Sequence, residues 1–167
     1  MDFNDIQLKH SDWEKAEKML VESNNDVAFF KRMVDIFIVA ASIGISEDKI
    51  IENENFDGKS IGRNTLNQNQ DVKHLITFLY QNAILSTSLI NLSNDERKSI
   101  AFNPSDDIAQ KYNPSSFLVP YANYGLKKLL ECITNHDVES ISNVINMINA
   151  YKDNPLDLEL EETDLDI

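Results

Sequence analysis

The chain has 167 residues, of which 42% are hydrophobic, and a formal net charge of −13. This length predicts one domain with one hydrophobic core, since domains of roughly 100 to 200 residues are usual. The single cysteine, Cys132, excludes an intrachain disulfide framework and a multi-thiolate metal site. The N-terminus is charged, and no apolar run reaches the roughly 18 residues of a membrane span. We therefore expect a cytoplasmic protein with no membrane contact.

The negative charge is concentrated at the C-terminus. Residues 153 to 167 contain seven carboxylates and no Lys or Arg. No basic cluster occurs in the chain, so direct binding of nucleic acid is not expected, because Lys and Arg contacts to phosphate supply most of that affinity. The composition divides the chain into a domain of residues 1–152 and an acidic tail of residues 153–167.

Two helices are predicted in the N-terminal part of the chain. The first is expected to begin at Ser11, which with Glu14 forms a capping-box pattern, and to end near residue 23. The second is expected to begin after Asn24-Asn25-Asp26 and to end at Gly44. Between Met33 and Ile45 only Asp35 and Ser42 are polar, which predicts a helix buried on nearly all sides, with Asp35 paired to Lys31 or Arg32.

Residues 46–70 form a long polar stretch without periodicity, in which Phe56, Ile61 and Leu66 are isolated apolar residues. A loop of this length is either functional, partly ordered through these three anchors, or disordered. A third helix follows, with Asp71 as its cap and His74 on a polar stripe. Its inward-facing residues are expected to be Val72, Leu75, Ile76, Leu79, Ala83, Leu89 and Ile90.

The remaining segments complete an all-α prediction. Residues 93–98 indicate a short connecting helix, and a longer helix is expected from Ser115 onward with Pro120 in its first turn. Gly125 lies on the apolar face of that helix and predicts close approach of another helix backbone. A last helix, from about Asp137 to Tyr151, should pair with it as an antiparallel hairpin. The expected fold is a compact helical bundle of about five to six helices with an acidic C-terminal tail.

Several short patterns resemble functional motifs but lack an essential part. Gly58-Lys59-Ser60 resembles the end of a phosphate-binding loop, but Asn53 stands where the first glycine belongs. The stretch from Asn53 has oxygen donors at alternate positions, yet the calcium loop that it resembles needs Glu where Asn64 stands. Cys132 and His136 make two metal ligands without a third. We therefore expect no metal, no cofactor and no catalytic residues, and the chain is not expected to be an enzyme.

The acidic tail has two interpretations. It is either a disordered solubilising extension or a docking segment. Leu156, Leu158 and Leu160 alternate with carboxylates, so an extended tail would present leucines on one side and charges on the other. In the second interpretation the leucines, with Glu161 and Glu162, dock on a positively charged partner protein.

Two segments resemble a known family. Residues 34–44 end in Ala-Ala-Ser-Ile-Gly, and residues 121–126 read Tyr-Ala-Asn-Tyr-Gly-Leu. This pattern is similar to that of a small accessory family associated with bacterial Dnd systems, which modify DNA by phosphorothioation and restrict unmodified DNA. The resemblance implies a role beside DNA-modifying or DNA-cleaving enzymes and supplies no catalytic residues. Tyr124 departs from the family, which favours a smaller residue there.

The expected function is that of a non-catalytic accessory or binding subunit in a bacterial DNA-modification or antiphage defence complex. Its partner would be a nuclease, ATPase or DNA-binding subunit with a basic surface. Tyr121, Asn123 and Tyr124 are candidate recognition residues, and their alternative role is capping and packing. The competing hypothesis is a phage-type acidic inhibitor or DNA mimic, because a small acidic protein can present carboxylates where phosphates would lie.

Overall fold

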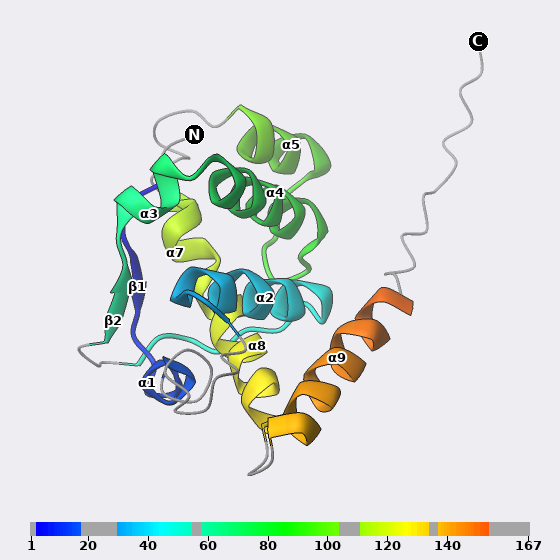
Figure 1. Cartoon of the computed structure of the whole chain (residues 1–167). Helices are drawn as coiled ribbons and strands as arrows, with labels where there is room; N and C mark the ends of the chain where they lie inside the picture. Colours follow the sequence, from blue (N-terminus) through cyan, green and yellow to red (C-terminus); the bar gives the residue numbers. More distant parts are fainter. Residues whose placement is uncertain (1–2, 18–29, 55–57, 104–110, 134–136, 154–167) are drawn as a thin grey trace.

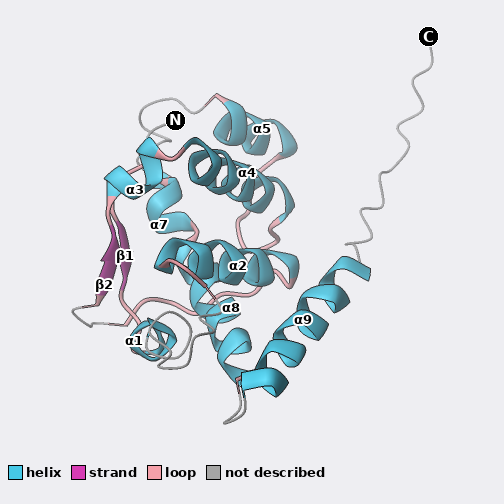
Figure 2. Cartoon of the chain, viewed as in Figure 1, coloured by secondary structure: helices cyan, strands magenta, loops and turns pink. Residues whose placement is uncertain are grey.

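Helices dominate the architecture, which confirms the all-α prediction (Figures 1 and 2). The computed structural model describes residues 3–17, 30–54, 58–103, 111–133 and 137–153. The predicted end of the first helix, the predicted cap of the second and the tail from residue 154 lie outside the described residues. No helix in the described part of the chain combines the length and apolar character that crossing a bilayer requires.

A two-stranded antiparallel sheet lies at the N-terminal side of the fold. Strand β1 (Ile6–Leu8) pairs with β2 (Lys59–Ile61), and Ile6 lies opposite Ile61. Ile6 and Leu8 are buried while Gln7 between them is exposed, as the two-residue period of a strand requires. This sheet was not predicted from the sequence, because three residues per strand are too few to show alternation.

The polar stretch of residues 46–70 is partly ordered, as one of its three predicted alternatives required. It contains β2 and helix α3 (Arg63–Gln68), and its anchors Ile61 and Leu66 are buried. Phe56 lies outside the described residues.

Helix α1 (Asp12–Ala16) packs Trp13 and Ala16 inward. The side chain of Ser11 does not cap this helix, so the capping-box prediction there is wrong.

Helix α2 (Met33–Ser46) is the central helix of the fold (Figure 1). It begins later than predicted, because residues 30–32 are not helical. Eight residues of α2 are buried, and the predicted ion pair forms between Arg32 and Asp35 at 2.7 Å. The burial is less complete than predicted, since Val39 is half-buried and Ser42 is exposed along its outer line.

Helices α4 (Gln70–Ser86) and α5 (Asn94–Phe102) lie side by side (Figure 1). Asn69 caps α4, in place of the predicted Asp71, by accepting hydrogen bonds from the backbone of residues 71 and 72. A complete capping box of Ser93 and Glu96 starts α5, which is longer than the predicted connector. The side chain of Gln81 donates to the Ala101 carbonyl at 3.3 Å and joins the two helices.

The C-terminal helices are α7 (Pro114–Phe117), α8 (Val119–Glu131) and α9 (Asp137–Asp153). Pro120 lies in the first turn of α8, as predicted. The chain reverses direction between α8 and α9 (Figure 1). Asn143 of α9 donates to the carbonyl of Cys132 at 3.2 Å, and the Cys132 sulfur lies 3.6 Å from that of Met147.

The crossing of α2 and α8 depends on one glycine from each helix. A Cβ atom on Gly125 would lie 1.9 Å from the Ala40 carbonyl oxygen, and one on Gly44 would lie 2.1 Å from that of Tyr121. Both distances are far below van der Waals contact, so each position requires glycine. The prediction for Gly125 is confirmed. The prediction that Gly44 ends its helix is wrong, because α2 continues to Ser46.

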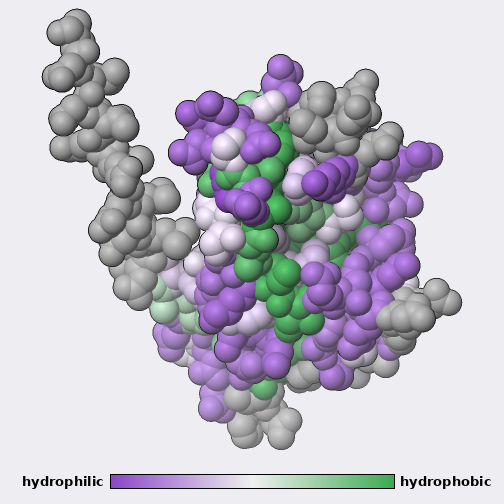
Figure 3. Space-filling model, turned by 180° about the vertical axis from the view of Figure 1, so that it is seen from behind, coloured by the Kyte–Doolittle hydropathy of each residue, from purple (hydrophilic) through white to green (hydrophobic). Residues whose placement is uncertain are grey.

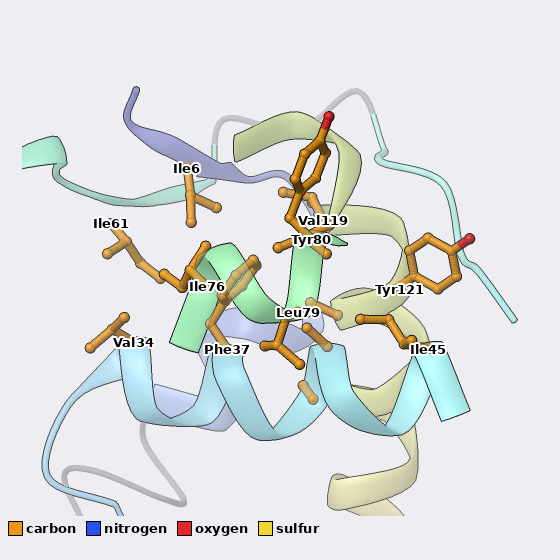
Figure 4. Packing of buried hydrophobic residues seen from close by; sticks show 14 of the residues in the cluster. Ile6, Val34, Phe37, Ile45, Ile61, Ile76, Leu79, Tyr80, Val119 and Tyr121 are labelled. Carbon is orange, nitrogen blue, oxygen red and sulfur yellow. The ribbon is translucent and has the colours of Figure 1, made fainter. Parts of the chain in front are cut away.

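The hydrophobic core lies between α2, α4, α8 and the sheet. Figure 4 shows Phe37 and Ile45 of α2, Ile76 and Leu79 of α4, and Ile6 of β1 pointing into one interior. Tyr80 is also buried, and its hydroxyl donates to the Tyr112 carbonyl at 2.8 Å. The edge helix α9 adds Val144 to the same core. This single packed unit holds the loops after α2 and α4 in place.

Candidate functional site

Asn123 of α8 joins three separated segments. Its side chain is fully buried; its Oδ1 accepts a hydrogen bond from Trp13 Nε1 at 2.8 Å. Its Nδ2 donates to the Ile51 carbonyl at 3.0 Å and to Asn53 Oδ1 at 3.1 Å. Because every polar atom of this amide is already bonded inside the fold, Asn123 offers nothing to a partner. The structure places this candidate recognition residue in the interior.

Tyr121 is likewise buried, with 3% of its surface exposed. Its hydroxyl donates to Thr87 Oγ1 at 2.6 Å, and Thr87 in turn donates to Asp48 Oδ1 at 2.6 Å. Asp48 also accepts from the backbone and the hydroxyl of Ser88. Tyr121 therefore secures the loop after α4 to the end of α2, and its burial rules out direct contact with a partner in this conformation.

Asp48 adopts a left-handed backbone conformation with φ of 48° at the C-terminus of α2. The amide of Lys49 bonds the Gly44 carbonyl and that of Asp48 bonds the Ile45 carbonyl, which is the hydrogen-bond pattern of a Schellman motif. Glycine usually occupies this position, so the hydrogen bonds to Thr87 and Ser88 offset the cost of an aspartate there. Burial favours a higher pKa for Asp48, but the bonds from Ser88 and Thr87 outweigh it and lower the pKa.

Tyr124, the third candidate recognition residue, is only half-buried. Its hydroxyl donates to Glu47, which also accepts from the hydroxyl of Tyr151 in α9 and from Lys49. Partial burial would raise the pKa of Glu47, but these three hydrogen bonds lower it to about 2. Glu47 is therefore ionised near neutral pH and ties α2, α8 and α9 together.

An apolar groove of about 370 Å³ lies beside this carboxylate. Val39, Ser42, Ile43 and Ser46 of α2 form one wall, and Ile148 and Tyr151 of α9 form the other. Ile148 is 43% exposed. The groove separates Ile148 from α2, so this apolar side chain is partly open to solvent.

A second apolar area covers α4 and the end of α5. We define the α4–α5 surface by its exposed hydrophobic residues, which are Leu75, Phe78, Leu85, Leu89 and Phe102. Leu75 and Leu89 were expected to face inward, and that prediction is wrong. Leu75 is 48% exposed although Val72 and Ile76, its neighbours on α4, are buried, and Leu89 lies beyond the end of the helix at Ser86.

The apolar area continues into a shallow hollow. Leu89 lines this hollow of about 200 Å³ together with Ile50, Ile90, Phe117 and Pro120. On the face opposite to that of Figure 1, hydrophobic residues form a band between hydrophilic areas (Figure 3). Exposed apolar patches often mark binding sites, so the α4–α5 surface is a candidate docking site.

The pKa values of several titratable side chains are shifted further from 7. Glu47 and Asp48 have lowered pKa values, which makes them weak bases. Burial raises the pKa of Cys132 and of Tyr121, and the hydrogen bond to Glu47 raises that of Tyr124. General acid–base catalysis favours a pKa near the working pH, and none of these groups has its pKa shifted toward 7.

The residues of the weaker sequence motifs have structural roles. Asn53 bonds Asn123, and Asn64 lies inside α3, so these two residues of the calcium-like pattern belong to separate elements. A Cβ atom on Gly58 would lie 1.9 Å from the Leu8 carbonyl oxygen, so this glycine permits the approach of the two strands. His136 lies outside the described residues. Within the described ranges no three His, Cys, Asp or Glu side chains are grouped to hold a metal ion.

Asp48, Thr87 and Glu47 were not predicted from the sequence. They bond residues that are distant along the chain, and no local pattern marks them. The predicted tail residues Leu156, Leu158, Leu160, Glu161 and Glu162 lie outside the described residues, so their partner-binding role stays a prediction. Comparisons of this chain with protein-family models, with curated proteins and with solved structures found no significant match.

Proposed function

We propose that this protein is a non-catalytic binding subunit that docks a partner protein on its α4–α5 surface. The proposal rests on the exposure of two aromatic side chains there, 61% for Phe78 and 63% for Phe102. The hydrogen bond between Gln81 and Ala101 brings the helix segments that carry these two residues side by side. Exposed aromatic residues on a rigid helical support are typical anchors of protein interfaces.

The spacing on α4 favours a helical partner. Leu75, Phe78, Asn82 and Leu85 of α4 follow one another at intervals of three and four residues. Residues at this spacing lie in one row along a helix, which an amphipathic helix of a partner can match. Asn82 in the middle of the row would fix the register, as a single polar residue does in helix pairs.

A half-buried arginine supports this surface. Arg97 of α5 donates to the carbonyls of Ile84, Ile90 and Leu92, at 2.8, 2.8 and 3.2 Å. Five fixed donors make a guanidinium suited to holding several carbonyls at once. The segment between α4 and α5, with Leu89 at its centre, is thereby held in one conformation, and a preformed surface loses less entropy when it binds.

The resemblance to the Dnd-associated family supports a more specific proposal, that the partner belongs to a DNA-modification or antiphage complex. The two resembling segments correspond to the two sides of the α2–α8 crossing, because they contain Gly44 and Gly125. In this chain the two segments form a close helix crossing, and they add no binding residue to the proposal.

The competing proposal, an acidic DNA mimic, has less support. Among described residues with described side chains, carboxylates and cationic side chains are nearly equal in number. Many of those carboxylates are paired or bonded internally, including Asp12 with Lys15, Glu17 with Lys59 and Glu131 with Lys128. A mimic needs unpaired carboxylates spread over its surface.

Co-isolation from the native cell tests the proposal. The tagged wild-type chain is compared with a Phe78→Ser, Phe102→Ser variant and with the control Ile145→Ser, which changes an exposed residue of α9. We expect the wild type and the control to retain a DNA-modifying or DNA-cleaving enzyme, or its ATPase, and the double variant to lose it. Equal retention by all three chains would refute docking on the α4–α5 surface, and capture of an invading element's target would favour the inhibitor.

A further inference from the structure

The groove between α2 and α9 lies apart from the α4–α5 surface. Its α2 wall, Val39, Ser42, Ile43 and Ser46, has the spacing of a single line along a helix. This is the arrangement with which a helix normally packs against a neighbour, yet Ser42 is exposed and Ile148 on the opposite wall is 43% exposed. The apolar walls of the groove are therefore accessible to an occupant.

We propose that the chain's own C-terminal tail occupies this groove, with Leu156, Leu158 and Leu160 against its apolar walls. The tail begins beside the groove, because Tyr151, which lines it, is only four residues before Pro155. Proline cannot continue a helix, so the chain is free to turn back at this point. The proposal is independent of the docking proposed for the α4–α5 surface.

The tail has the length that this position requires. Tyr151 donates to Glu47 at the C-terminal end of α2, so the tail starts there. The fourteen residues of α2 span about 21 Å at 1.5 Å each. Residues 156–162 span about 23 Å when extended at about 3.3 Å each. An extended tail is therefore long enough to bring Glu161 and Glu162 to the N-terminal end of α2.

The charges agree with this direction. Lys31 and Arg32 precede α2, and a helix N-terminus itself attracts negative charge. Asp35 pairs with Arg32 and cancels part of that charge, whereas Lys31 is exposed. At the other end, where Glu47 lies, Leu156 and Leu158 flank a single carboxylate, Asp157. The alternation of Leu156 to Leu160 with carboxylates places the leucines toward the groove and the charges toward solvent.

Paramagnetic relaxation in the full-length chain tests the proposal. Cys132→Ser keeps a hydroxyl donor in place of the thiol that donates to the Lys128 carbonyl. In that background, Thr163→Cys carries a nitroxide without altering any carboxylate. We expect the amide signals of residues 33–39 of α2 to lose most of their intensity, and those of α4 to keep theirs. Unchanged α2 signals, or signal loss on α4 in their place, would overturn the proposal.

Four controls sharpen the result. Adding Leu158→Ser and Leu160→Ser should restore the α2 signals, and Lys31→Glu should restore them in part. The matched charge change Lys127→Glu, on an exposed residue of α8, should have no effect. In a mixture of isotope-labelled chains without nitroxide and unlabelled chains with it, the α2 signals should persist. Their loss in the mixture would show that the tail binds a second copy, which contradicts the intramolecular assignment.

Discussion

Gly125 in α8 and Ala40 in α2 approach so closely that a Cβ atom on the glycine would lie 1.9 Å from the alanine carbonyl oxygen. One helical turn away along both helices, Gly44 of α2 has the reciprocal position, because a Cβ atom there would lie 2.1 Å from the Tyr121 carbonyl oxygen. The two backbones therefore touch at two points. This contact sets the separation of the central helices and, through it, the positions of the loops that follow α2 and α4.

Substitution of either glycine should destabilise the fold. We expect Gly125→Ala and Gly44→Ala each to lower the free energy of unfolding by about 3 kcal/mol, because a packed crossing cannot absorb a methyl group against a carbonyl. Gly62→Ala is the control, since nothing lies within 4 Å of its Cβ position, and it should change stability by no more than about 0.5 kcal/mol. Urea unfolding measures all three, and equal stabilities would refute the close crossing.

The left-handed conformation of Asp48 separates two contributions to stability. Asp48→Ala should cost about 3 kcal/mol, because it removes the hydrogen bonds from Thr87 and Ser88 and leaves a side chain at a positive φ. Asp48→Gly removes the same bonds but relieves the backbone, so it should be about 1 kcal/mol more stable than the alanine variant. If denaturant titrations show that the glycine variant is no more stable than the alanine variant, the positive φ at this position does not affect stability.

Asn123 should be essential for stability and not replaceable by a small apolar residue. Asn123→Ala leaves the buried Trp13 indole N–H and the Ile51 carbonyl without their partner, which should cost about 3 kcal/mol. Trp13 is the only tryptophan, so its fluorescence reports unfolding directly. Asn82→Ala, at an exposed position of α4, is the control and should unfold like the wild type. A wild-type midpoint for Asn123→Ala would contradict the assigned network.

The Glu47 cluster predicts a loss of stability in acid. Hydrogen bonds lower the pKa of Glu47 from 4.5 to about 2 in the folded protein. The unfolded chain therefore takes up a proton first as the pH falls, so the contribution of Glu47 is complete above about pH 4.5 and is lost toward about pH 2. The difference in unfolding free energy between wild type and Glu47→Gln should shrink over this range. A difference independent of pH would show that Glu47 has an ordinary pKa.

The extent to which the sequence predicted this fold depends on how local each signal is. The contact at Gly125 could be predicted because a glycine in the middle of an apolar helix face usually marks a close approach of two backbones. Gly44 could not, because a glycine near a helix end is usually a terminator, and here the helix continues for two more residues. The sheet was missed because its strands are three residues long.

The candidate sites were less predictable for a different reason. Tyr121 and Asn123 stand out in the sequence as polar groups beside an apolar helix face, but their partners Thr87 and Ile51 are distant along the chain, and only the fold shows that they are buried. Leu75 was predicted to face inward because it is apolar, yet it is exposed. Hydrophobic periodicity alone does not distinguish a core face from a docking face.

Calorimetric titration of the co-isolated partner into the purified full-length chain asks most directly whether the α4–α5 surface binds a partner protein. We expect Phe78→Ser with Phe102→Ser to weaken binding at least about 100-fold, since two anchors of about 2 kcal/mol each are removed. Ile145→Ser should bind like the wild type. An affinity unchanged by the double substitution would contradict docking on this surface.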